Sequence, residues 1–231
     1  MLGWRWSQPT IRQVGAEVVE CRACPRLVRW REQVAADRRA SYAEEEYWGR
    51  PVPGFGDPAA SLWVVGLAPA AHGGNRTGRV FTGDRSGDWL FRSLHGAGYA
   101  NQPTSDHRHD GLRLRGAYVS AAVRCAPPGN RPTPAERDSC QPFLAREWAL
   151  LAQVRVVLAL GSFAYQVVAA TVGLRPRPAF GHGVEASLPD GRHVMCSYHP
   201  SQQNTFTKRL TEEMFDRVIG RARELTETSR R

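Results

Sequence analysis

Lysine is almost missing from this chain of 231 residues, since Lys208 is its only lysine. Arginine therefore carries nearly all of the positive charge, and the formal net charge is +9. A basic protein attracts polyanions such as nucleic acid. An arginine bias also arises in GC-rich genomes without selection for binding, so composition leaves a nucleic-acid partner and an ordinary basic surface as alternatives. No lysine is suitably placed to act as a nucleophile.

Long apolar runs are missing as well. The longest, near Val154 to Leu160, is interrupted by Arg155 and is too short to cross a membrane. Residues 1–13 contain Trp4 and Trp6 but no continuous apolar stretch, so they do not resemble a secretory signal. We therefore expect a cytoplasmic protein without a membrane partner. Its length and the lack of internal repeats predict one domain over residues 1–231.

Several common cofactor and metal motifs are absent. The chain has no Walker pattern ending in Gly-Lys-Ser/Thr and no GxGxxG, which removes most support for a nucleotide cofactor. It also lacks the H-x-E…P-C-x-x-C signature of zinc-dependent deaminases.

Short apolar segments alternate with helical patterns along the chain. The expected strands are Leu62 to Leu67, Tyr118 to Val123, Arg155 to Leu160 and His193 to Tyr198. The expected helices are Ile11 to Cys21, Leu27 to Ala36, Trp89 to Ala97, Phe163 to Thr171 and Met214 to Leu225. Alternating strands and helices predict an α/β fold with a parallel sheet covered on both faces. Ligands of such sheets bind at the carboxyl ends of the strands.

Four of the five cysteines have a spacing that suits a metal site. Disulfides are not expected in the cytoplasm, so the four thiolates are predicted to bind metal: Cys21, Cys24, Cys125 and Cys140. Zinc and a [4Fe-4S] cluster both accept four thiolates, and the spacing does not choose between them. A chance CxxC or a redox pair is the alternative. Cys196 lies inside a strand and is expected to be an ordinary buried thiol.

Unusual loops follow three of the expected strands. The first, "GLAPAAHGGNRTGRVFTGD" (residues 66–84), offers the aromatic face of Phe81 beside the carboxylate of Asp84. Taken alone, Phe81 is more often a core residue and Asp84 more often a helix cap. The second, "RCAPPGNRPTPAE", forms a rigid turn beside Cys125. In the third, "SYHPSQQNTFT", Pro200 holds His199 extended at the mouth of a strand.

Together, these three motifs and the order of the four cysteines resemble the uracil-DNA glycosylase superfamily, and most closely its family 5, or type B, branch. The resemblance covers about Cys21 to Leu210. It implies a three-layer α/β/α sandwich with a central four-stranded parallel sheet, and a structural [4Fe-4S] cluster held by the four cysteines. It also implies excision of uracil, and often of other deaminated bases, from double-stranded DNA. We expect a monomer associated with the nucleoid of a prokaryotic cytoplasm.

The resemblance also implies roles for single residues. Phe81 would stack on the flipped-out base, and His199 would donate a hydrogen bond to the departing base. Asp84 would orient or activate water and stabilise the cation-like sugar. Asn75 and Asn130 are further candidates for polar contacts to base or water. Because no lysine is suitably placed, water should capture the sugar, which makes the expected enzyme monofunctional.

The loops would also meet the DNA backbone. The candidate phosphate contacts are Arg76, Arg79 and Lys208. The segment Ser201 to Thr207, with Ser201 and Asn204, would lie against the backbone, and Gln202 and Gln203 would wedge into the duplex. For each of these residues, solvation at the surface is the alternative.

Three residues at two strand ends depart from other branches of the superfamily. Leu67 and Ala68 stand where relatives carry polar side chains, and Ala121 stands where some carry a base-reading asparagine. The departures support two readings of function. One is a glycosylase whose base pocket has a looser selectivity, and the other is a non-catalytic iron-sulfur DNA-binding protein of the same fold.

A pocket without a side-chain amide imposes a smaller penalty on other bases. We therefore expect excision of hypoxanthine as well as of uracil, measured on matched duplexes. A preference for uracil above about ten thousandfold would contradict this expectation.

Overall fold

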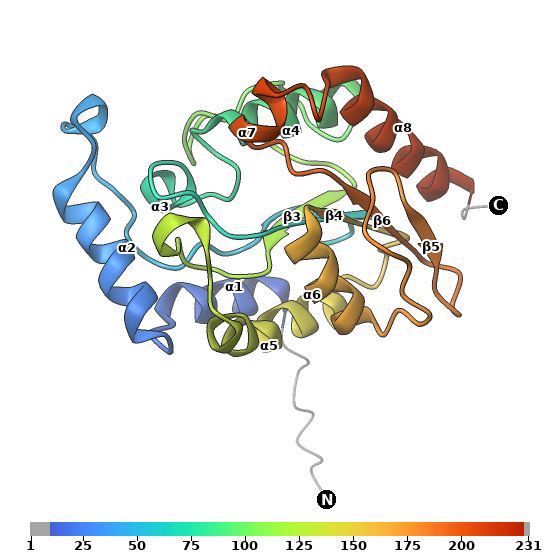
Figure 1. Ribbon diagram of the computed structural model, residues 1–231, viewed down its shortest axis with the longest axis horizontal. Helices are drawn as coiled ribbons and strands as arrows, with labels where there is room; N and C mark the ends of the chain where they lie inside the picture. Colours follow the sequence, from blue (N-terminus) through green and yellow to red (C-terminus); the bar gives the residue numbers. More distant parts are fainter. Residues whose placement is uncertain (1–9, 229–231) are drawn as a thin grey trace, which may run out of the picture.

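Four parallel strands form the centre of the sheet in the computed structural model, which describes residues 10–228 (Figure 1). Trp4 and Trp6 lie outside the described residues. The parallel strands are β2 (Leu62–Gly66), β3 (Ala117–Ala121), β4 (Val156–Leu160) and β6 (His193–Ser197). All five residues of β2, β3 and β4 are buried, because helices cover both faces of the sheet. The predicted parallel sheet is confirmed.

Two short antiparallel strands extend this sheet at its edges. They are β1 (Phe55–Gly56), which pairs with β3, and β5 (Glu185–Ser187), which pairs with β6, giving the order β1-β3-β2-β4-β6-β5. The sheet therefore has six strands rather than four. Strands of two and three residues carry too little alternation to be predicted from sequence.

Two layers of helices complete the sandwich. The helices are α1 (Ile11–Glu20), α2 (Pro25–Asp37), α3 (Gly74–Thr77), α4 (Arg85–Gly96), α5 (Pro134–Leu150), α6 (Ser162–Val172), α7 (Gln202–Phe206) and α8 (Glu212–Thr228). In Figure 1, α4 and α8 lie on one side of the sheet and α1, α5 and α6 on the other. Side chains alternate along β2: Leu62 and Val64 pack toward α4 and α8, whereas Trp63 and Val65 pack toward α5 and α6.

Helix α5 has no counterpart among the helices expected from sequence. It contacts both α1 and α6 and shows no single apolar face, so the helical periodicity is weak. Its start is nevertheless marked by Thr133, Pro134 and Glu136. Thr133 and Glu136 form a reciprocal capping box, and Pro134 occupies the first turn. Within the described part of the chain, none of the helices has the length and hydropathy needed to cross a membrane.

Arg79 lies inside the protein rather than on a DNA-facing surface. Its guanidinium donates to both carboxylate oxygens of Asp110, at 2.9 and 2.6 Å, and to Thr82 at 2.9 Å. The side chains of Arg79 and Asp110 are only 4% and 7% exposed. The predicted phosphate contact by Arg79 is therefore corrected, since this guanidinium is already bound and shielded from solvent.

Arg76 is also internal, with 7% exposure. It pairs with Glu45 and donates to the backbone carbonyls of His72 and Gly83 at 2.8 and 3.0 Å. These bonds connect different parts of the loop after β2, residues 66–84, which we call the strand-end loop. They also connect this loop to the segment before β1. The predicted phosphate contact by Arg76 is corrected for the same reason, because its donors serve the loop.

The pair of Arg79 and Asp110 predicts a loss of stability in acid. Burial raises the pKa of Asp110, but the hydrogen bonds from Arg79 and from the N–H groups of Leu112 and Asp106, together with the charge of Arg79, outweigh burial and lower this pKa to about 2. A lowered carboxyl pKa stabilises the fold above about pH 4 and loses that contribution as the pH falls toward 2. Replacing Asp110 with Asn strands a buried guanidinium without its counter-charge and should lower the free energy of unfolding by about 3–5 kcal/mol.

Urea denaturation measures this effect. Asp138→Asn is the matched control, because Asp138 forms an exposed ion pair with Arg137 and should change stability by only about 0.5 kcal/mol. The difference between wild type and Asp110→Asn should shrink as the pH falls from 5 to 2. Equal effects of the two substitutions at neutral pH would contradict the prediction.

Candidate active site

The ends of β2 and β6 bring Phe81 and His199 together. Their rings are stacked, with centroids 5.8 Å apart and planes at 29°. Gly66, the last residue of β2, makes room for the aromatic ring, because a β-carbon there would lie 2.5 Å from Phe81 Cζ. Phe81 itself has a φ of +51°, which is rare for a bulky residue and marks a constrained backbone. The aromatic ring and imidazole predicted from separate motifs therefore do meet.

Asp84 is held at the start of α4. Its carboxylate accepts a hydrogen bond of 3.0 Å from the Gly87 N–H, so it is also the N-cap of that helix. Gly73 lies directly against this carboxylate, because a β-carbon at Gly73 would overlap with Asp84 Oδ2. Burial raises the pKa of Asp84 to about 6, although the N–H groups of Gly87 and Ser86 oppose the rise. Near neutral pH this carboxylate is poised to exchange a proton.

His199 is held by its own loop. Its carbonyl accepts hydrogen bonds from the Asn204 side chain at 2.9 Å and from the Ser201 N–H at 2.8 Å. Gly161, at the end of β4, approaches the His199 side chain closely. Burial lowers the pKa of His199 to about 4, so the imidazole is neutral at physiological pH. A neutral imidazole still offers one N–H as a hydrogen-bond donor.

His199 and Asp84 line two different cavities. The cavity at His199 has a volume of about 230 Å³, and its walls include Leu67, Phe163, Phe180, Tyr198 and Arg209. The cavity at Asp84 has a volume of about 570 Å³, and its walls include Tyr42, Glu45, Arg76, Asp106 and His107. Phe81 connects the two residues: its ring packs on His199, while its carbonyl lies against Gly87, whose N–H donates to Asp84.

The other predicted base contacts have different positions. Ala121 is buried at the end of β3, in register with Gly66, and Ala68 packs near the cysteines. Asn130 is exposed in the turn after Cys125, with a φ of +56°. Asn75 is fully buried, and its amide donates to the Arg31 carbonyl at 3.2 Å. The predicted contact of Asn75 with a base is corrected, because this side chain is enclosed between α2 and α3. Its side-chain oxygen has no hydrogen-bond partner among the described residues.

The loop after His199 forms the short helix α7. Ser201 caps it by accepting from the Asn204 N–H at 3.4 Å, whereas Gln202, Gln203 and Lys208 are exposed. Phe206, which the motifs do not single out, has a side chain that is 64% exposed, with the Arg85 guanidinium 4.4 Å from its ring centroid. Its signal is a lone aromatic residue in a polar segment. An exposed apolar side chain beside a cavity suits contact with a partner.

The four predicted cysteine ligands line one cavity. Cys21 follows α1, Cys24 precedes α2, Cys125 follows β3 and Cys140 lies in α5. Within residues 10–228, no group of three or more histidine, cysteine or acidic side chains has the arrangement that would hold a metal ion.

Two buried arginines beside this cavity indicate whether it suits an anionic metal–thiolate group. Arg31 and Arg124 are each 1% exposed, and Arg31 Nη1 donates to Cys125 Sγ at 2.9 Å. Arg124 Nη2 donates to the buried carboxylate of Glu147 at 2.5 Å. Arg31 Nε, Arg124 Nε and Arg124 Nη1 are buried and lack hydrogen-bond partners among the described residues. Buried positive charge and unpaired donors are costly unless an anionic group satisfies them. Metal-bound thiolates supply such charge, so these residues fit the group.

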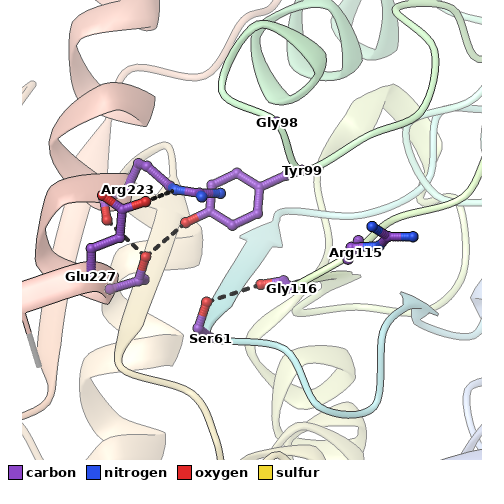
Figure 2. Close-up of a pocket in the computed structure, with 8 residues that line it drawn as sticks. Ser61, Gly98, Tyr99, Arg115, Gly116, Arg223 and Glu227 are labelled. Atoms are coloured by element: carbon purple, nitrogen blue, oxygen red, sulfur yellow. Dashed lines mark hydrogen bonds and ion pairs between the residues drawn. The ribbon is translucent and has the colours of Figure 1, made fainter. Parts of the chain in front are cut away.

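A further cavity, of about 340 Å³, lies at the opposite ends of the strands (Figure 2). Ser61 and Gly116 immediately precede β2 and β3, and Tyr99 donates to or accepts from Thr226 at 3.0 Å. Arg223 pairs with Glu227 beside it. This cavity contains none of the residues that the motifs predicted.

Comparison with known proteins points to one family. The family model described as the uracil DNA glycosylase superfamily matches residues 53–223. The chain is 52% identical over 219 residues to a protein of Mycobacterium tuberculosis named type-5 uracil-DNA glycosylase, covering 94% of this chain and 82% of the relative. It is 53% identical over 206 residues to the Thermus thermophilus protein of the same name, covering 89% and 93%. A type-4 uracil-DNA glycosylase of Archaeoglobus fulgidus is 31% identical over 118 residues, covering 51% of each chain.

Proposed function

Because the chain belongs to the uracil-DNA glycosylase superfamily, we propose that it excises uracil from double-stranded DNA and leaves an abasic site for base excision repair. The observation that carries the proposal is the contact of Phe81 with His199 at the strand ends, three residues from a carboxylate with a raised pKa. The relatives are named as glycosylases, so a non-catalytic DNA-binding protein is not favoured. The expected site of action is the prokaryotic cytoplasm, at the nucleoid.

Base recognition starts with extrusion of the nucleotide from the duplex. Phe81 supplies an aromatic face at the end of β2, and His199 lies beside it with a neutral ring. As the glycosidic bond breaks, its electrons pass to the base, which departs as an anion. The His199 N–H stabilises that charge without first having to gain a proton. Leu67 makes one wall of the adjoining cavity apolar, which supports a range that includes hypoxanthine.

Asp84 serves the sugar side of the reaction. Its carboxylate stabilises positive charge at the sugar carbon and orients or deprotonates the attacking water. The raised pKa, about 6, makes it a stronger base than an ordinary aspartate while leaving it ionised at pH 7.5. The contacts with Gly73 and Gly87 fix its position, so little reorganisation is needed during the reaction.

A [4Fe-4S] cluster is the proposed metal group of the four cysteines. When bound, it supplies a rigid cross-link between α1, α2, α5 and the end of β3, rather than chemistry on the base. Arg31 compensates its negative charge from the protein side, whereas the charge of Arg124 is already balanced by Glu147 and Arg124 offers only its unpaired N–H groups.

The proposed DNA surface surrounds α7. It includes Ser201, Gln202, Gln203, Asn204 and Lys208, and Phe206 joins it as the residue best suited to enter the duplex. An aromatic side chain that is mostly exposed can fill the gap left by an extruded base and stack on its neighbours.

Excision assays on a duplex with one uracil test the catalytic assignment. His199→Ala removes the donor to the departing base and should lower kcat by about 100- to 1,000-fold. Asp84→Asn should lower it by about 100- to 10,000-fold. In wild type the rate should rise with pH through about 6, as Asp84 loses its proton, while His199 stays neutral. Asp84→Asn should lack this rise.

Two exposed residues provide controls for these substitutions, His95→Ala and Asp138→Asn. Both should excise uracil at the wild-type rate. Full activity of folded His199→Ala or Asp84→Asn would refute the assigned roles. A wild-type protein that binds DNA but produces no alkali-labile site would favour the non-catalytic alternative.

Phe206→Ala tests whether Phe206 enters the duplex in place of the extruded base. Loss of stacking worth about 1–3 kcal/mol should slow excision from duplex DNA by about 5- to 150-fold and leave excision from single-stranded DNA nearly unchanged. Trp30→Ala removes another exposed aromatic, on α2, and should alter neither rate. An equal loss on both DNA forms would mean that Phe206 does not act by filling the duplex.

A further inference from the structure

Arg31 directs a buried charge at the cysteine cavity. It stands in the middle of α2, is 1% exposed, and donates to Cys125 Sγ at 2.9 Å and to the Cys21 carbonyl at 3.3 Å. The nearest carboxylate, on Glu32, is 3.8 Å away and is already bound by both terminal nitrogens of Arg22. The charge of Arg31 is therefore left for the cysteine sulfurs.

The backbone of the same residue contacts the strand-end loop. The Arg31 carbonyl accepts a hydrogen bond of 3.2 Å from the amide of Asn75, which is fully buried in α3. The Asn75 carbonyl in turn accepts from the Gly49 N–H at 3.0 Å. One amide thus ties α3 to α2, at the residue that touches the metal-site cysteine.

From α3 the contacts continue to Asp84. Gly73, at the start of α3, lies against the Asp84 carboxylate. Arg76 donates from α3 to the Gly83 carbonyl at 3.0 Å. A shift of α3 would therefore move the residues that enclose Asp84.

We propose that Arg31 and Asn75 are positioning residues that couple the metal group at the four cysteines to the order of the loop that carries Asp84. The proposal rests on the proposed function, because it needs a metal group at the cysteines and a catalytic role for Asp84. Metal binding fixes the positions of Cys125 and of the Arg31 side chain that donates to it. The Arg31 carbonyl then fixes the Asn75 amide, and Asn75 holds α3 in place. Neither residue touches the substrate.

Hydrogen–deuterium exchange of the peptide spanning residues 73–84 reads this coupling without any substrate. Removal of iron by a chelator should speed exchange in residues 73–84 of the wild type, while the middle of α8 responds less. Asn75→Ala should show fast exchange there even with iron bound, and chelation should add little to it. This non-additivity is the signature of coupling.

The rate of iron release and the kinetics of uracil excision distinguish the roles of Arg31 and Asn75. Arg31→Met should lose iron to the chelator about 10- to 100-fold faster than wild type, and its exchange in residues 73–84 should rise. Asn75→Ala should release iron at the wild-type rate, while kcat for uracil falls about 10- to 100-fold with little change in KM. Arg29→Met, an exposed position on the same helix, and Asn101→Ala, which loses an exposed amide-to-carbonyl bond, are the controls.

The outcomes distinguish the coupling from the proposed function. Exchange in residues 73–84 that ignores iron removal, or Asn75→Ala that retains the full wild-type response, would overturn the coupling. If Arg31→Met does not fold, Asn75→Ala still decides it. Coupled exchange in a wild-type protein that leaves uracil in place would refute the function and not the coupling. Uracil excision with exchange indifferent to iron would refute the coupling and not the function.

Discussion

The close approach of two side chains to two glycines is the constraint on which the site depends. Gly66 leaves the space in which the Phe81 ring lies, and Gly73 leaves the space for the Asp84 carboxylate. Any larger residue at either position would displace the ring or the carboxylate. The enclosure also reduces the contact of Asp84 with water, and this partial burial is the main cause of its raised pKa. The packing of this loop around Asp84 therefore also determines the acid–base behaviour of the Asp84 carboxylate.

Four arginines lie in the interior of this protein rather than at its surface. Arg79 and Arg76 hold the strand-end loop, and Arg31 and Arg124 face the cysteine cavity, all with 7% exposure or less. A guanidinium suits such positions because its fixed fork satisfies several acceptors at once and keeps its charge. The net charge of +9 therefore does not indicate where DNA would bind, since several of the positive charges are not at the surface.

Much of the architecture is local enough to be predicted. The four central strands are continuous apolar runs, and each begins and ends within about two residues of its expected range. The four cysteines and the strand-end motifs were recognised because their spacing along the chain is characteristic. Helix α5 is not predicted from the sequence because it packs on two sides and its apolar residues do not recur with helical spacing. Strands β1 and β5 are not predicted because they are too short to show an alternating pattern.

The sequence by itself determined the α/β class, the family resemblance and the residue types at the strand ends, because these depend on local pattern and spacing. Only the tertiary structure decided which arginines and asparagines are buried, that Phe81 stacks on His199, and that Asp84 and His199 line separate cavities. These features depend on contacts between residues far apart in the chain. Such contacts follow from how the layers pack, and no local spacing encodes them.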